Sequence, residues 1–125
     1  MLKRRYEILL PLRFNDGRPV PDEVFNETRE DLLARFEGLS WVPHPVQGIW
    51  RHEGTTYEDA TIRVVIDVED TAETRQFFVE WKPTLLRRFD QLEIYIVSYP
   101  IDRVRRIVPE IRPVSRYEAS PCRSN

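Results

Sequence analysis

The strongest constraint on this chain is a regular alternation of side chains over residues 60–68, Ala-Thr-Ile-Arg-Val-Val-Ile-Asp-Val. Ile62, Val64, Ile66 and Val68 occupy every second position, which is the period of a strand with one buried face. All four are β-branched, and such side chains pack well on a pleated surface. We therefore predict a strand here and place the other elements around it.

Two segments have the spacing of apolar residues that is typical of an amphipathic helix. The first begins at Pro21, followed by acidic residues that favour a helix start, and ends at Gly38. The second begins with Asp70 and Glu73, which have the spacing of a capping box. Because a proline inside a helix loses a hydrogen bond and clashes with the preceding turn, at a cost of about 3 kcal/mol, we expect a kink or a break at Pro83.

Three more strands are predicted from alternation and turn signals. Residues 5–12 and 92–99 form the first and the last strand. Residues 46–51 form a short strand that reaches the central one through a hairpin turn, where Gly54 can adopt a positive φ. Residues 41–45 contain two prolines, so they are either irregular or at a sheet edge.

The resulting order, strand–helix–strand–strand–helix–strand, is that of the split βαβ arrangement. Right-handed crossovers then place both helices on one face of a four-stranded antiparallel sheet. We predict an α+β fold, a ferredoxin-like βαββαβ sandwich, over residues 3–100. Residues 101–125 are predicted to be an extended, partly disordered basic C-terminal tail, with apolar residues between Ile101 and Ile111 that could anchor its first part.

A short block of sequence carries a family resemblance. Residues 48–51 (Gly-Ile-Trp-Arg), Gly54 and residues 58–61 (Glu-Asp-Ala-Thr) precede the central strand. This block resembles small uncharacterised bacterial proteins of ferredoxin-like outline, over roughly residues 5–100. More broadly, the outline is similar to dimeric α/β-barrel proteins, which pair their sheets face to face. The resemblance implies a fold and a paired sheet, and it transfers no catalytic residue.

Charge and composition argue against nucleic acid and membrane partners. The formal net charge is −2, with 13 Lys and Arg against 18 Asp and Glu in residues 1–100, and 6 against 3 in residues 101–125. No stretch approaches the roughly 20 apolar residues of a membrane span. The single cysteine, Cys122, cannot form a disulfide within the chain, which suits a reducing compartment. We expect a soluble, cytoplasmic protein of bacterial type.

The sheet face opposite the helices is predicted to carry many apolar side chains. Such a patch on a soluble protein indicates an interaction surface. We predict a homodimer through this face, with Arg63 of one chain near Glu93 or Asp67 of the other. The alternative is that residues 101–111 fold back and cover it. The predicted interface residues are Leu9, Arg63, Val65, Tyr95, Val97 and Tyr99.

The hairpin before the central strand gathers four amphipathic side chains, Trp50, Arg51, His52 and Tyr57. Arginine can lie over an aromatic ring, and a cluster of this kind can recognise a small anion or a partner. The four are predicted as ligand-binding residues. The simpler interpretation is that Trp50 belongs to the core and Arg51 is exposed, as alternation along a strand requires.

Two groups of possible metal ligands lack supporting patterns. One flanks the hairpin and has neither HxH nor HExxH spacing; it comprises His44, His52, Glu53 and Asp59. The other lies near strand ends and comprises Asp16, Asp67, Glu69 and Asp70. Such carboxylates could hold magnesium in a nuclease. Turn formation explains Asp16, however, and helix capping explains Asp70. We predict no catalytic residue, metal or cofactor.

These observations together favour a non-catalytic protein-interaction or regulatory module that self-associates. The alternative is a small enzyme or ligand sensor that binds an anionic metabolite or nucleotide near the hairpin of residues 50–57. The two differ in whether a concave site with converging polar groups is present.

Overall fold

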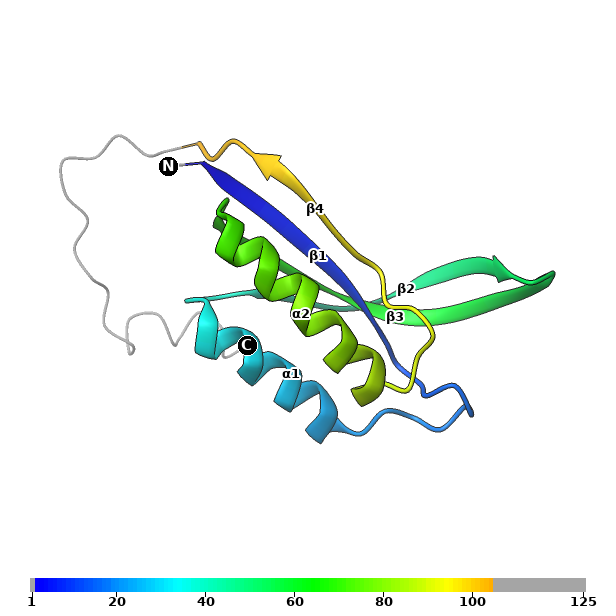
Figure 1. The fold of residues 1–125 in the computed structure, drawn as a ribbon. Coiled ribbons are helices and arrows are strands. Elements are labelled where there is room, and N and C mark those ends of the chain that lie inside the picture. Colours follow the sequence, from blue (N-terminus) through cyan, green and yellow to red (C-terminus); the bar gives the residue numbers. More distant parts are fainter. Residues whose placement is uncertain (1, 105–125) are drawn as a thin grey trace.

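The computed structural model describes residues 2–104, apart from the side chain of His44. Its elements are β1 (Lys3–Pro11), α1 (Asp22–Arg35), β2 (Ser40–His52), β3 (Thr55–Glu69), α2 (Ala72–Arg88) and β4 (Ile96–Ile101). The four strands form one antiparallel sheet in the order β2-β3-β1-β4, and both helices lie on the same side of it (Figure 1). This is the predicted ferredoxin-like α+β fold. The predicted tail from residue 105 onward lies outside the described residues.

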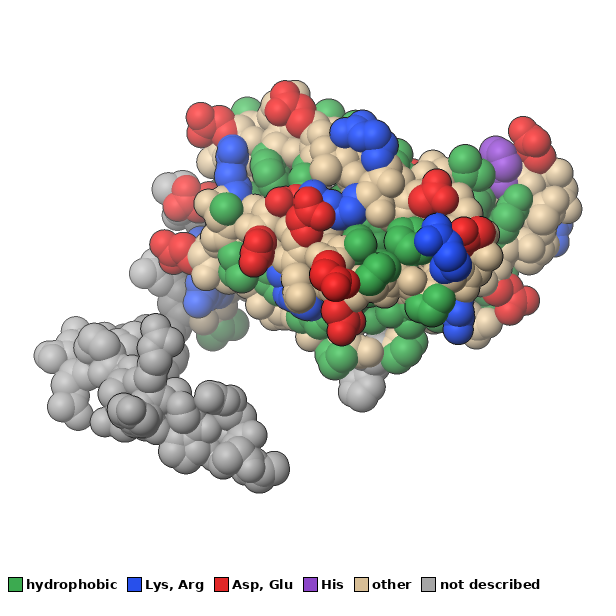
Figure 2. Space-filling view, turned by 90° about the horizontal axis from the view of Figure 1, so that it is seen from below, with side chains coloured by type: hydrophobic (Ala, Val, Ile, Leu, Met, Phe, Trp, Pro, Cys, Tyr) green, Lys and Arg blue, Asp and Glu red, His purple; other side chains and the backbone are tan. Residues whose placement is uncertain are grey.

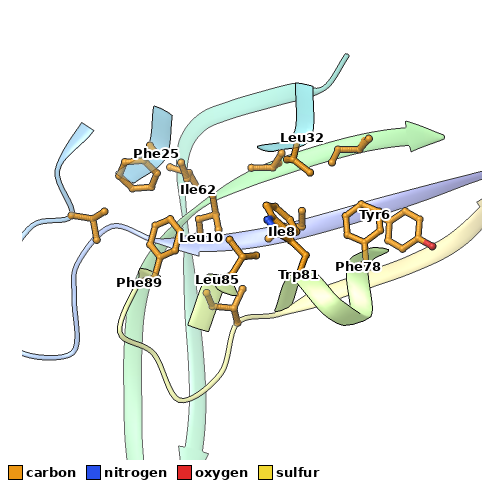
Figure 3. Packing of buried hydrophobic residues seen from close by; sticks show 14 of the residues in the cluster. Tyr6, Ile8, Leu10, Phe25, Leu32, Ile62, Phe78, Trp81, Leu85 and Phe89 are labelled. Atoms are coloured by element: carbon orange, nitrogen blue, oxygen red, sulfur yellow. The ribbon is translucent and has the colours of Figure 1, made fainter. Parts of the chain in front are cut away.

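The core lies between the two central strands and the helices. β1 and β3 pair with Ile8 opposite Val64, and the side chains that point toward the helices from both strands are buried. Figure 3 shows them meeting the buried residues of α1 and α2, among which Leu32 and Leu85 are almost fully enclosed. Burying a side chain of this size contributes about 1.5–3 kcal/mol. The alternation in residues 60–68 therefore does locate the core face of the sheet.

The hairpin of β2 and β3 projects beyond the helices (Figure 1). Its two-residue turn has Glu53 at φ 50° and Gly54 at φ 81°, and two positive φ values are the mark of a type I′ turn. β2 begins at Ser40 and includes Pro43 and Pro45, with a register shift between Val42 and Val46. Because β2 is an edge strand, the missing N–H groups cost no ladder bond inside the sheet. The edge-strand interpretation of residues 41–45 is therefore correct.

The second helix differs from its prediction in two ways. α2 is one helix that continues through Pro83, so the predicted break is wrong. Pro83 lies on the exposed side of the helix, where water can replace the lost hydrogen bond. The N-cap is Thr71, whose side chain accepts from the backbone N–H of Thr74 at 3.1 Å, and not Asp70. Asp70 instead accepts a hydrogen bond from Arg4 at 3.1 Å.

The last strand is displaced from the predicted residues 92–99. β4 runs from Ile96 to Ile101, beyond Pro100, which an edge strand tolerates. The chain leaves α2 through Asp90, with φ 52°, and approaches β1 only at Tyr95, whose carbonyl accepts from the N–H of Leu9 at 3.0 Å. Leu92 is therefore 66 % exposed and not part of the core. None of the helices within residues 2–104 is long and apolar enough to cross a membrane.

Candidate functional site

Three of the four predicted ligand-binding residues lie together on the hairpin. Trp50 is directly opposite Tyr57 in the ladder, and their rings are stacked with centroids 4.5 Å apart. The ring of His52 is 6.3 Å from that of Trp50. Trp50 Nε1 also donates a 2.8 Å hydrogen bond to the carboxylate of Asp59. Trp50 is not one of the buried core residues, so the simpler interpretation of this side chain is wrong.

Arg51 is not brought to this cluster. Side chains alternate between the two faces of a strand, so Arg51 lies on the face opposite Trp50. Its Nε donates to the Thr56 hydroxyl at 3.2 Å, and both residues are exposed. The cluster therefore has Asp59 as its charged member, and an anionic ligand would meet a carboxylate there.

The sequence pattern places Asp59 only in a possible metal site, although strand alternation also indicates its position beside Tyr57. Asp59 is two residues after Tyr57 in the same strand, so the two side chains share a face. Trp50 is diagonal to Asp59 across the hairpin, within reach of a long side chain. To place Asp59 next to Trp50, one must also know the register of the hairpin, which is set by its two-residue turn.

Two hollows meet at Trp50 and Asp59, and both are lined by Pro11 and Gln91. One, of about 350 Å³, lies between the hairpin and the chain that approaches β4, and its other walls include Leu9, Ile49 and Tyr95. The second, of about 800 Å³, lies toward the loop after β1, and its other walls include Phe14, Tyr57 and Leu92. The Asp59 carboxylate is thus reachable from both hollows, whose walls also include the charged side chains of Arg13 in the larger and Glu93 in the smaller one.

The predicted carboxylate groups do not form a metal site. Asp16 lies 2.6 Å from Arg18, and Asp67 lies 2.7 Å from Arg5. Hydrogen bonds from the backbone and side chain of Arg18 lower the pKa of Asp16, and the hydrogen bond from Arg5 lowers the pKa of Asp67. Among residues 2–104, with the side chain of His44 excepted, no group of three or more His, Cys, Asp or Glu side chains could hold a metal ion.

The predicted interface residues do share the sheet face opposite the helices, which we call the open face. Leu9, Val65 and Val97 are partly buried on it, whereas Tyr95 and Tyr99 are 58 % and 39 % exposed. The Tyr99 hydroxyl donates to Glu7, and this hydrogen bond raises the pKa of Tyr99. The open face therefore combines apolar side chains with polar ones.

The charged groups of the predicted interface have partners within the chain. Arg63 lies 3.8 Å from Glu7, and Asp67 is paired with Arg5. Glu93 lies 2.9 Å from Lys82 of α2. The predicted ion pairs between two copies are therefore not needed to satisfy these groups.

The fold is shared with several solved structures. It is similar to the divalent cation tolerance protein CutA1 of Thermus thermophilus, with a TM-score of 0.57, 17% identity, and 82% of this chain and 87% of that one covered. CutA1 of Oryza sativa gives a TM-score of 0.58 at 10% identity, with 84% of each chain covered.

A third similar structure is a phage SAM lyase in complex with S-methyl-5'-thioadenosine, with a TM-score of 0.56, 14% identity, and 81% of this chain and 90% of that one covered. No protein-family profile matches the sequence, and neither does any curated protein. At such low identities the likeness establishes a common ferredoxin-like fold and no common activity.

Proposed function

We propose that the protein is a non-catalytic binding module that self-associates through its open face. The observation that carries this proposal is the set of apolar side chains that this face presents around the ion pair of Glu7 and Arg63; they are Leu9, Val65, Tyr95, Val97 and Tyr99. If each of these five side chains removes on the order of 60–100 Å² of apolar surface from water, the hydrophobic contribution to the free energy of association is at most about 7–12 kcal/mol per subunit. Association costs roughly 4–15 kcal/mol, so assembly should depend on concentration.

The helical side of the molecule is a poorer surface for pairing. Helix α1 holds five acidic residues against two arginines. Figure 2, seen from the side of α1, shows acidic side chains spread over this surface. Two copies that meet through it would place like charges together, which costs several kcal/mol. On the open face Glu7 and Asp67 are paired with Arg63 and Arg5 within the chain, so this penalty is smaller there.

The named roles of the similar structures are not carried over unchanged. Three of the four predicted carboxylates near strand ends, Asp16, Asp67 and Asp70, are engaged by arginines, so a divalent-cation site is not proposed. The phage enzyme was solved with a small ligand. A second candidate function, a ligand sensor, is favoured by the two hollows beside Trp50 and Asp59.

Sedimentation velocity over a range of concentrations tests the first proposal. We expect a reversible change in the sedimentation coefficient of the full chain with concentration. Tyr95→Glu should weaken association by about 30-fold or more, because an aromatic side chain that becomes buried in an interface contributes about 2 kcal/mol. Val79→Glu is the matched control, since Val79 is similarly exposed, at 65 %, but lies on α2.

Two results would contradict the proposal. One is a full chain that sediments as a 15.0 kDa monomer at every concentration. The other is equal weakening by both substitutions, which would mean that the open face has no special role. If the full chain is monomeric and a chain ending at Val104 aggregates, residues 105–125 cover the open face instead.

A further inference from the structure

The described part of the chain contains two tryptophan–aspartate pairs with nearly the same hydrogen bond. Trp81 Nε1 donates to Asp31 at 2.9 Å between the two helices. Trp50 Nε1 donates to Asp59 at 2.8 Å on the hairpin. In both pairs the indole satisfies one oxygen lone pair of a carboxylate that can accept several bonds.

The first pair is completed by a cation, and the second is not. Arg88 lies 2.9 Å from the Asp31 carboxylate, with its side chain only 12% exposed. The other two partly buried carboxylates, those of Glu7 and Asp70, also have arginines within 4.0 Å. Asp59 is the exception, since no lysine or arginine of residues 2–104 lies within 4.0 Å of it. Its negative charge is open to a group from outside the chain.

The surroundings of Asp59 fit a flat or slender organic cation. Trp50, Tyr57 and Tyr95 supply aromatic walls on the two hollows that meet there. A cation over an aromatic ring gains about 0.5–2 kcal/mol. The smaller hollow, of about 350 Å³, is at the low end of the size range of small-molecule sites and would hold a group of side-chain size.

The chain uses the same chemistry internally at three other places. Guanidinium carbons lie over aromatic rings at 4.1 to 5.1 Å from the ring centroids; the pairs are Arg18 with Phe14, Arg29 with Trp41 and Arg35 with Phe77. Together with Arg88 on Asp31, these contacts show both ways in which a guanidinium is held: by a carboxylate and by a ring. At the hairpin both kinds of partner converge, and no lysine or arginine of residues 2–104 lies within 4.0 Å of Asp59; Arg13, which lines the larger hollow, donates instead to the Gly17 carbonyl at 2.9 Å.

The geometry points to a binding site for a guanidinium or alkylammonium group between Trp50 and Tyr95, with Asp59 as its counter-charge. The group can belong to a small metabolite or to an arginine side chain of a peptide, because both present the same N–H donors. An anionic metabolite or nucleotide would meet the Asp59 carboxylate instead. The site shares Leu9 and Tyr95 with the proposed interface on the open face, so the titration is done at a concentration at which the chain sediments as a monomer.

The test follows the indole N–H resonances of the three tryptophans by nitrogen–proton NMR during titration of the full chain. The probes are Nα-acetyl-arginine amide and its uncharged isostere, Nα-acetyl-citrulline amide. We expect a saturable shift of the Trp50 resonance, assigned with Trp50→Phe, with the arginine probe, and affinity for the citrulline probe weaker by about 10-fold or more. The Trp81 resonance reports that the fold is retained. Agmatine, which has a guanidinium but no peptide groups, is titrated in the same way. Binding of agmatine as tight as that of the arginine probe indicates a small metabolite, whereas binding of the arginine probe alone indicates a peptide.

Asp59→Asn keeps an oxygen for the Trp50 hydrogen bond and removes the charge. It should weaken binding of the arginine probe by about 10-fold or more. Glu69→Gln is the matched control, since it makes the same charge change in β3 at a position outside both hollows and should leave binding unchanged. No shift of Trp50 with any cationic probe, equal binding of both acetylated amides, or equal weakening by the two substitutions would overturn the inference.

Discussion

The helical body and the projecting hairpin both contain a hydrogen-bonded tryptophan–aspartate pair, but the surroundings of the two pairs differ. In the body, Asp31 accepts from Trp81 and is neutralised by Arg88, so a tryptophan, a carboxylate and a cation close a contact between the two helices. On the hairpin, Asp59 accepts from Trp50 at nearly the same distance and has no such cation within residues 2–104. The role of a tryptophan–aspartate pair therefore depends on whether a cation of the same chain completes it.

The largest difference between these regions should appear on removal of a single aromatic ring. Phe89 is fully buried in the body, whereas Tyr57 is partly exposed and stacked on Trp50. Phe89→Ala should lower the free energy of unfolding by about 3–5 kcal/mol, because it leaves a cavity. Tyr57→Ala should cost about 0.5–1.5 kcal/mol for the lost ring pair. Urea unfolding followed by circular dichroism measures both, and equal losses would contradict the view of the hairpin as an arm outside the core.

The second comparison removes the charge from each aspartate. Asp31→Asn leaves Arg88, which is only 12% exposed, with Glu27 at 3.5 Å as its remaining ion-pair partner. It should lower the free energy of unfolding by about 1–3 kcal/mol, the cost of a nearly buried charged group that loses a hydrogen-bond partner.

Asp59→Asn has no such consequence, because no arginine depends on Asp59 within residues 2–104. Its stability should stay within about 0.5 kcal/mol of the unsubstituted chain, as for most surface substitutions. A large loss at Asp59 would mean that this carboxylate is structural, like that of Asp31, and would count against the proposed cation site.

The turn that carries the hairpin gives a third and smaller effect. Gly54 has φ 81°, a conformation that L residues adopt at a cost of about 1–2 kcal/mol. Gly54→Ala should therefore lower the free energy of unfolding by about 1 kcal/mol. Gly48→Ala is the control in the same hairpin, since its Cβ would meet only the Asp59 carbonyl at 3.8 Å. If the two substitutions cost the same, turn strain is not what fixes the hairpin register.

The sequence was sufficient for the fold because its signals there are local. The alternation from Ile62 to Val68 identified the buried face of β3, and the order of elements then determined the topology. The errors lie where distant contacts decide. Asp70 has the spacing of an N-cap, but Arg4 and Arg75 hold its carboxylate, and Thr71 caps α2. Nothing in the local sequence predicts the arginine from β1.

The candidate site was only partly predictable for the same reason. Trp50, His52 and Tyr57 were found because they cluster in the sequence, and that cluster also included Arg51, which the register turns to the other face. Asp59 can be recognised as the charged member only when the strand register is known. That no lysine or arginine of residues 2–104 lies within 4.0 Å of Asp59 is a property of the folded chain and has no sequence signal.

The smallest effect concerns the acid stability of the ion pair between Arg5 and Asp67 on the open face. The hydrogen bond from Arg5 lowers the pKa of Asp67 below its ordinary value of 3.8. A carboxyl group whose pKa is lowered by folding stabilises the folded state above its ordinary pKa, and this contribution is lost as the pH falls toward the folded-state pKa. The free energy of unfolding should therefore decline below about pH 4 partly through this group.

Asp67→Asn and Arg5→Gln remove the same pair, so both should flatten this decline to a similar and small extent. The pair is at the protein surface, so about 1 M salt should reduce the difference from the unsubstituted chain. Urea unfolding between about pH 5 and pH 2 measures it. If only Asp67→Asn changes the pH dependence, a cation other than Arg5 lowers the pKa of Asp67. Asp67 on the open face would then have a different ion-pair partner from the one that the self-association proposal assumes.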